Sequence, residues 1–330
     1  MRTGVGLAFL CLACCFHGSL SCPALCKCYP RRAEVVCNDV PLTEFPSQGL
    51  PKNTSLLTIQ FTNISSISEH HLSAMPLLEG LHLYSNNLES LSSHLLRGVP
   101  HLKTLDLTDN KLAHLPQDVF SHAPLQSLVL KSNLIETVDA DWFPPNSSLT
   151  WLDLSGNRLT SIPSALFQRL PHLENLDLSY NRLEKLPPDS LKPLTRLERL
   201  NLRNNKLSSL DPSVFQGASN LTFLFLPENR LEKLSPTLFQ GLSKLRYLTL
   251  DGNQLSHVPP GLLDPLLSLD EEGLDLTVNP WLCDGKVEYF WRWLVKNKQK
   301  AFAEVNIICA QPLSLAGRSI SSLMENELNV

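Results

Sequence analysis

Residues 83–115 read LYSNNLESLSSHLLRGVPHLKTLDLTDNKLAHL, and one pattern of leucines around an asparagine occurs in them twice, at Asn86 and at Asn110. The pattern, L-x-x-L-x-L-x-x-N-x-L-x-x-L, then continues along the chain, and its asparagines are 24 residues apart six times and 23 apart once. A less regular copy precedes these units and another follows them, which makes about ten units. The repeated asparagines are Asn86, Asn110, Asn133, Asn157, Asn181, Asn205, Asn229, Asn253 and, in the last unit, Asn279.

Each unit predicts one short strand, because the L-x-L alternation places both leucines on the same face. A single unit has no core of its own, so the units must coil and stack to bury their leucines in one column. The chain then turns inside the stack, where backbone groups need hydrogen-bond partners. An asparagine carries both a donor and an acceptor, so we interpret the repeated asparagines as a structural ladder.

The beginning of the chain has the pattern of a secretory signal peptide, which we expect to comprise residues 1–21. Arg2 precedes an apolar run over residues 5–16, and small residues stand at Ser19 and Ser21. No later run reaches the roughly 18 apolar residues that a membrane-spanning helix needs. We therefore predict a secreted protein without a membrane span.

Charge argues against nucleic-acid binding. The formal net charge is −4, and without residues 1–21 it becomes −5, since Arg2 is the only charged residue lost. A general nucleic-acid-binding protein would need a basic face.

The remaining cysteines form two clusters at opposite ends of the chain. An even number of cysteines in a secreted chain predicts disulfides, although spacing alone leaves three pairings open for the first four. A metal site is disfavoured, because Cys26 and Cys28 have no histidine pair nearby. Four N-x-S/T motifs predict N-glycosylation at Asn53, Asn63, Asn146 and Asn220.

The repeat resembles that of the extracellular leucine-rich repeat family over residues ~55–281. The resemblance implies an α/β solenoid shaped like a horseshoe, with a concave parallel β-sheet and a cysteine-rich cap at each end. We expect an N-terminal cap at 22–54, repeats at 55–278, and a C-terminal cap and tail at 279–330. The family's N-terminal cap implies the pairs Cys22–Cys28 and Cys26–Cys37. In the C-terminal cap Gly285 replaces one of the family's usual cysteines, which leaves Cys283 to pair with Cys309.

No group of residues has the spacing of a catalytic or metal site, so we expect neither enzyme activity nor a cofactor. Binding is then expected on the concave face, where strands present side chains in rows. The residues between the strand leucines include Asp106, Asp153, Asp177 and Phe225, and neighbouring rows add Arg199, Arg203 and Phe223. The candidate partner-binding residues are Asp106, Asp109, Trp151, Asp153, Asp177, Tyr180, Phe225, Glu228, Tyr247 and Asp251. Aspartate is also the commonest residue at this strand position in the family, so these carboxylates have an alternative interpretation as solvated background.

Within the family, the two-cysteine C-terminal cap and the segments GLDLTVNPWLCD (273–284) and YFWRWL (289–294) resemble a branch of plasma proteins. This branch comprises the leucine-rich alpha-2-glycoproteins and the beta-type phospholipase A2 inhibitors of snake blood. The resemblance to the inhibitors implies a homotrimer in plasma that binds basic group II secretory phospholipase A2. The alternatives are a serum glycoprotein that binds growth factors or other plasma proteins, and an extracellular matrix or adhesion ligand.

Overall fold

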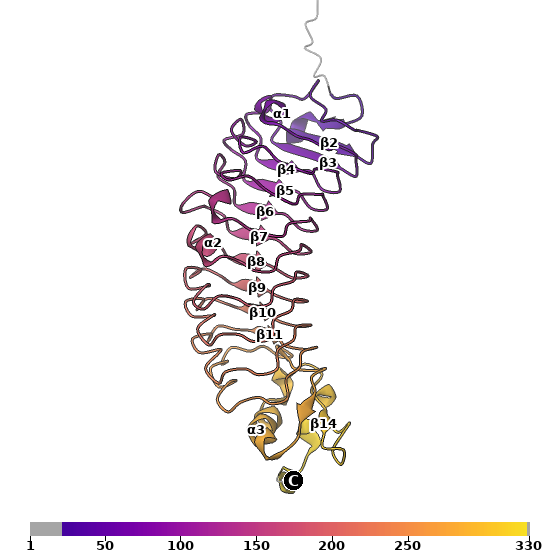
Figure 1. Ribbon diagram of the computed structural model, residues 1–330. Helices are drawn as coiled ribbons and strands as arrows, with labels where there is room; N and C mark the ends of the chain where they lie inside the picture. The colour runs from indigo at the N-terminus through magenta and orange to yellow at the C-terminus, as the bar shows by residue number, and fades with distance from the viewer. Residues whose placement is uncertain (1–21, 329–330) are drawn as a thin grey trace, which may run out of the picture.

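The computed structural model describes residues 22–328, so the expected signal peptide at 1–21 lies outside the described residues. These residues form one curved stack of coils, in which a sheet of twelve strands follows the order of the chain from β1 to β12 (Figure 1). The predicted solenoid with a parallel sheet is confirmed. The strands are β1 Lys27–Tyr29, β2 Glu34–Asn38, β3 Leu56–Gln60, β4 Gly80–His82, β5 Thr104–Asp106, β6 Ser127–Val129, β7 Trp151–Asp153, β8 Asn175–Asp177, β9 Arg199–Asn201, β10 Phe223–Phe225, β11 Tyr247–Thr249 and β12 Leu274–Asp275.

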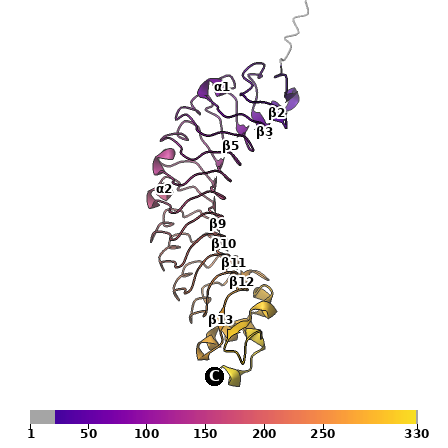
Figure 2. The same cartoon turned by 45° about the vertical axis from the view of Figure 1, so that its right-hand side comes forward.

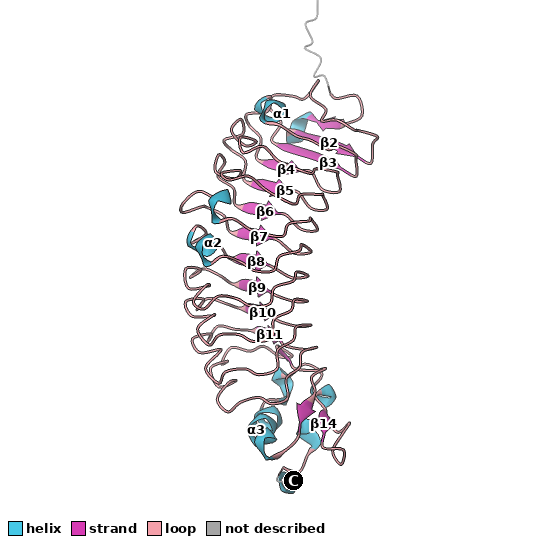
Figure 3. Ribbon diagram, in the orientation of Figure 1, coloured by secondary structure: helices cyan, strands magenta, loops and turns pink. Residues whose placement is uncertain are grey.

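The strands line the inner side of the curve, and the two short helices α1 (Glu69–Ser73) and α2 (Ser164–Gln168) lie on its outer side (Figure 2). Most of the outer side is loop (Figure 3). Its packing comes from buried phenylalanines such as Phe215 and Phe239, whose ring centroids are 6.3 Å apart. Because these loops occupy more space than the extended strands opposite them, the stack curves toward the sheet.

The middle residue of each strand forms the apolar column that the repeat predicts. Leu152, Leu176 and Leu200 are register partners on adjacent strands, and each is at most 1% exposed. The residues on either side of each leucine point to the opposite face of the sheet. Each strand therefore has one buried side chain and two side chains that face the concave side.

The repeated asparagines form a buried ladder of hydrogen bonds between coils. The Asn181 side chain donates through Nδ2 to the Leu154 carbonyl of the preceding coil at 2.9 Å, and its Oδ1 accepts from the Leu159 backbone N–H at 3.0 Å. Nδ2 also lies 3.1 Å from the Leu178 carbonyl of its own coil. One side chain thus satisfies backbone groups on both sides of the turn.

The residue before each ladder asparagine has a left-handed backbone. The φ angles are 53° at Tyr180, 54° at Glu228 and 55° at Asp109, and the same position holds Gly156 at 66° and Gly252 at 64°. This turn directs the chain away from the sheet after every strand. Glycine adopts the conformation without strain, whereas the other residues are held in it by the stack.

The N-terminal cap continues the sheet. Strands β1 and β2 pair antiparallel, and β2 pairs parallel with β3, the first strand of the repeats. Disulfides join Cys22 to Cys28 and Cys26 to Cys37, the pairs that the family resemblance implies. The cap therefore covers the first coil with hydrogen-bonded backbone as well as with side chains.

The C-terminal cap packs helix α3 (Glu288–Lys296) against the last coil. Phe290 and Leu294 are buried, and the Phe290 ring lies 5.0 Å from that of Trp281. A second sheet pairs β13 (Trp281–Leu282) with β14 (Cys309–Gln311), and a disulfide joins Cys283, directly after β13, to Cys309. The remaining helical turns of the chain are 3-10 segments at Pro30–Arg32, Ala140–Trp142, Gly285–Val287, Lys298–Lys300, Glu304–Asn306, Ile320–Ser322 and Glu325–Glu327.

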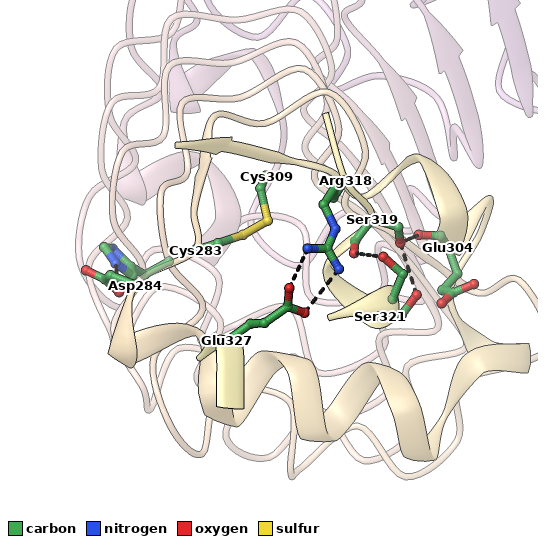
Figure 4. The surroundings of a disulfide bond; sticks show 10 residues. Cys283, Asp284, Glu304, Cys309, Arg318, Ser319, Ser321 and Glu327 are labelled. Carbon is green, nitrogen blue, oxygen red and sulfur yellow. Dashed lines mark hydrogen bonds and ion pairs between the residues drawn. A yellow bond between two sulfur atoms is a disulfide. The ribbon is translucent and has the colours of Figure 1, made fainter. Parts of the chain in front are cut away.

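An ion pair ties the end of the described chain to this cap. Arg318 makes two hydrogen bonds to the Glu327 carboxylate, of 2.6 and 3.1 Å, beside the Cys283–Cys309 bridge (Figure 4). The Trp291 indole donates to the Leu323 carbonyl at 3.0 Å. Between residues 22 and 328 the structure contains no helix with the length and apolarity required to cross a bilayer.

Candidate functional site

The first and third residues of each three-residue strand face the concave side. The register of the sheet aligns them in two rows, which we call the first row and the third row after these positions. The first row comprises the first residue of each strand, namely Gly80, Thr104, Ser127, Trp151, Asn175, Arg199, Phe223 and Tyr247. The third row comprises the third residue, namely His82, Asp106, Val129, Asp153, Asp177, Asn201, Phe225, Thr249 and Asp275. Six of the ten candidate residues therefore lie in the strands themselves, and the other four lie in the segments that follow the strands.

Each aspartate of the third row has a structural role that the sequence did not reveal. One carboxylate oxygen accepts a hydrogen bond from the backbone N–H two residues later, at 2.9 Å for Asp106 and Asp177 and 2.8 Å for Asp153. Asn201 does the same for Arg203 at 3.1 Å. The bond stabilises the end of the strand, so aspartate at this position does not by itself indicate a binding site.

The second carboxylate oxygen distinguishes the aspartates of β5, β7 and β8. Asp106 Oδ2 lies 3.9 Å from the His82 ring, and Asp177 Oδ2 accepts from the Asn201 amide at 2.8 Å. Asp153 Oδ2 has no hydrogen-bond or ion-pair partner among residues 22–328. Asp275, on the last strand, likewise accepts both of its bonds, from Thr277, at Oδ1. Asp153 differs from Asp275 in lying on the same face as the exposed Trp151, so it is the stronger candidate for accepting a bond from a partner.

Trp151 and Asp153 stand on the same face of β7, beside Asp177 on β8 and near Tyr180 in the turn that follows β8. Trp151 is 41% exposed and Tyr180 is 52% exposed, which is unusual for such large side chains. We name these four residues the β7–β8 patch. It combines exposed aromatic area with negative charge at the middle of the concave face.

Local surroundings change the acidity of these carboxyls. Burial raises the pKa of Asp153 above its ordinary value, and the negative charge of Asp177 on the adjacent strand raises it further. Burial also raises the pKa of Asp106, but hydrogen bonds from His82 and Thr108 outweigh it and leave that pKa lowered. Asp251 has a raised pKa through burial and the charge of Asp275. Asp153 thus loses its charge at a higher pH than Asp106.

The next three strands carry a different chemistry. Phe223 on β10 stacks on Tyr247 of β11, with ring centroids 5.3 Å apart and planes within 8°. The guanidinium of Arg199 lies 4.5 Å from the centre of the Phe225 ring, within the range of a cation–π contact. We name these four residues the β9–β11 cluster. The sequence places Phe225 and Tyr247 on the concave face but does not show that Arg199 covers an aromatic ring.

Three of the candidate carboxylates lie beyond the strands. Asp109 and Glu228 occupy left-handed turns, and Asp251 follows the end of β11. Glu228 makes an ion pair with Arg203 and accepts from Asn204 at 2.8 Å. Its charge is therefore largely neutralised by a neighbour, which makes it a weaker candidate for attracting a cationic partner than Asp153.

Of the four candidate glycosylation sites, Asn53, Asn63 and Asn146 are exposed and Asn220 is half-exposed. Within residues 22–328 no three histidine, cysteine, aspartate or glutamate side chains come close enough to hold a metal ion. Three disulfides indicate an oxidising, extracellular environment.

Comparison with known proteins agrees with this architecture. The family described as "Leucine rich repeat" matches four overlapping segments, residues 52–112, 100–159, 147–207 and 195–255. The chain belongs to the leucine-rich repeat family. Repeat proteins of this kind bind partners on regular surfaces, so a protein-binding role follows from the family and the fold.

Two curated relatives are phospholipase A2 inhibitors from snakes. The chain is 42% identical over 53 residues to phospholipase A2 inhibitor beta of Elaphe climacophora and 40% identical over 53 residues to phospholipase A2 inhibitor of Gloydius brevicaudus siniticus. Each match covers 16% of this chain and 16% of the relative, so it spans only a small part of either protein.

Solved structures match over nearly the whole chain. A chain of the octameric complex of Latrophilin 3, Unc5D and FLRT2, in which FLRT2 contributes the leucine-rich repeats, has a TM-score of 0.67 and 25% identity over 93% of this chain and 99% of that one. Human 5T4, a trophoblast glycoprotein, has a TM-score of 0.54 and 25% identity over 94% of this chain and 99% of its own.

Proposed function

We propose that this protein is a secreted, non-enzymatic inhibitor that captures a basic group II secretory phospholipase A2 on its concave face, as a defence against the animal's own venom. The observation that carries the proposal is the β7–β8 patch, where the unpaired oxygen of Asp153 lies beside the exposed Trp151. The similarity to two phospholipase A2 inhibitors supports the choice of partner.

Charge and aromatic area have separate tasks in this proposal. Asp106, Asp153 and Asp177 attract a basic protein and raise the rate of association, an effect that salt weakens. Trp151 and Tyr180 then supply desolvated contact area, which lowers the rate of dissociation. The inhibitor need not enter the enzyme's active site, because it can cover the basic and apolar surface with which the enzyme contacts membranes.

The test uses residues 22–330 as a secreted, disulfide-bonded protein. We expect it to bind a basic group II phospholipase A2 and to reduce hydrolysis of phospholipid vesicles, while an acidic phospholipase A2 of the same fold is bound weakly. Equal binding of both enzymes, or of neither, contradicts the proposal.

A capture experiment separates this function from its alternatives. Immobilised protein is incubated with plasma and with venom, and the retained proteins are identified by mass spectrometry. Retention of a phospholipase from venom supports the inhibitor. Retention of growth factors alone, or of matrix and cell-surface proteins alone, instead supports the serum-glycoprotein or the adhesion alternative.

A further inference from the structure

A column of cations runs along one side of the solenoid, outside the concave face. The residue that follows each ladder asparagine is Arg158, Arg182, Lys206 and Arg230 in four consecutive coils. Arg158, Arg182 and Arg230 are exposed and Lys206 is half-exposed. The left-handed turn and the ladder asparagine separate each of them from the concave rows.

Backbone hydrogen bonds fix the register of this column. The N–H of Arg182 donates to the Leu159 carbonyl of the preceding coil at 2.8 Å, that of Lys206 to Leu183 at 2.9 Å and that of Arg230 to Leu207 at 2.8 Å. Because the coils stack at about the 4.8 Å strand spacing, four successive cations extend over roughly 15 Å.

Few carboxylates neutralise the column. Within residues 22–328, Arg182, Lys206 and Arg230 have no carboxylate within 4.0 Å, whereas Arg158 lies 3.8 Å from Glu136. The coil of Arg182 and the coil of Arg230 each contain one further glutamate and one further lysine after the column residue. In each coil the charges of this glutamate and this lysine cancel. The four residues are Glu184, Lys185, Glu232 and Lys233.

The column reaches the C-terminal cap. A groove of about 650 Å³ lies between the last coils and α3. Its charged lining residues are Lys233, Lys286 and Arg292 together with the carboxylates Glu232 and Glu288. Lys233 and Lys286 form no ion pair with a carboxylate in the described part of the chain. Because Arg292 pairs with Glu288, the groove adds only a small positive excess to the column, which itself carries the proposal.

We propose that this column binds a linear sulfated polysaccharide. A row of like charges raises the electrostatic potential along a line, which favours a polymer that carries anions at short, regular intervals. The disulfides indicate an extracellular environment, where sulfated polysaccharides are abundant linear polyanions. The polymer lies along the stack, on a surface distinct from the β7–β8 patch, so both ligands can bind together.

The test measures the affinity for size-defined heparin at about 0.05 M and about 0.15 M salt. We expect the triple variant Arg182→Gln, Lys206→Gln, Arg230→Gln to bind roughly tenfold more weakly, or worse. The slope of log Kd against log salt should become shallower by roughly two, because three fewer counterions are displaced. Its thermal unfolding should be unaffected or shifted upward, since the variant removes like charges from one surface.

The matched control is Arg31→Gln, Lys52→Gln, Lys192→Gln, which changes the net charge equally at scattered exposed positions. Replacing Arg182 and Arg230 by lysine retains the charge and should retain binding. The proposal is overturned if heparin does not bind at the lower salt concentration, or if the triple variant binds like wild type. It is also overturned if the control loses as much affinity, or if single-stranded DNA of equal charge binds the column more tightly than heparin.

Discussion

Single side chains hold the coils of this protein together and also distinguish its proposed binding surface. A ladder asparagine such as Asn181 satisfies buried backbone groups on two coils, and a third-row aspartate such as Asp153 holds the end of its strand with one oxygen. A structural role and the proposed binding role therefore meet in a residue such as Asp153. Substitutions that separate the two roles are the most informative.

Asn181→Ala should lower the free energy of unfolding by roughly 1–3 kcal/mol, because the Leu159 N–H and the Leu154 carbonyl lose their buried partner. Chemical denaturation measures the change, and Arg182→Gln at the adjacent exposed position serves as control. Partner binding per folded molecule should be unaffected. An unchanged free energy of unfolding in Asn181→Ala would mean that the ladder does not stabilise the stack.

Asp153→Asn should raise the free energy of unfolding by roughly 0.2–1 kcal/mol at pH 7, because it removes a like-charge contact with Asp177 across adjacent strands. An amide oxygen can still accept from the Ser155 N–H, as the side chain of Asn201 does from Arg203.

The increase in the free energy of unfolding caused by Asp153→Asn should depend on pH in one direction. The folded-state pKa of Asp153 is raised, so the folded protein takes up its proton first as pH falls. The advantage of Asp153→Asn should therefore disappear as pH falls through the raised pKa toward the ordinary value of about 3.9. Urea titrations at several pH values measure it. A gain that grows on acidification would contradict this assignment.

At the scale of elements, the two caps solve the same problem differently. The N-terminal cap adds strands β1 and β2 to the sheet, whereas the C-terminal cap covers the last coil with helix α3. Val287, Phe290, Trp291 and Leu294 have the spacing of one helical face. Phe290 and Leu294 are buried on α3 and Val287 in the 3-10 turn before it, whereas Trp291 is only half-buried. The cysteine spacing at the other end gave no indication that β2 would pair with the first repeat, because that pairing depends on contacts distant in sequence.

Phe290→Ala should destabilise the C-terminal cap by roughly 3–5 kcal/mol, since Phe290 is 1% exposed and packs on Trp281. Hydrogen exchange should rise first in residues 274–328 and much less in the central coils, because each coil contacts only its neighbours. Val295→Ala, at an exposed position of the same helix, should leave exchange as in wild type. Uniform acceleration along the chain would show that the cap is not a separate cooperative unit.

At the scale of the molecule, charge is divided among surfaces rather than spread evenly. Carboxylates gather on β5, β7 and β8, aromatic rings with Arg199 on β9 to β11, and cations along the side of the stack. The repeat period makes the rows readable from sequence, which is why Asp153 and Trp151 could be placed on the concave face. Net charge averages over these surfaces, so it gave no sign of the column from Arg158 to Arg230.

Pairing between side chains could not be read from the sequence. The ion pair of Glu228 with Arg203 and the bond from Asn201 to Asp177 join neighbouring coils, and rotamers decide whether they form. Among the aspartates of β5, β7 and β8, these contacts leave an unpaired second oxygen at Asp153 alone. The sequence was therefore sufficient to predict the fold and to place the candidate residues on the concave face. The structure was needed to distinguish one candidate residue from another.

The most direct test of the central claim is the kinetics of binding to a basic phospholipase A2 at low and moderate salt. The double variant Asp153→Asn, Asp177→Asn should associate more slowly than wild type, with a weaker dependence on salt. Trp151→Ala should mainly dissociate faster, through the loss of on the order of 2 kcal/mol of contact. Wild-type rates in both variants would contradict a binding site at the β7–β8 patch.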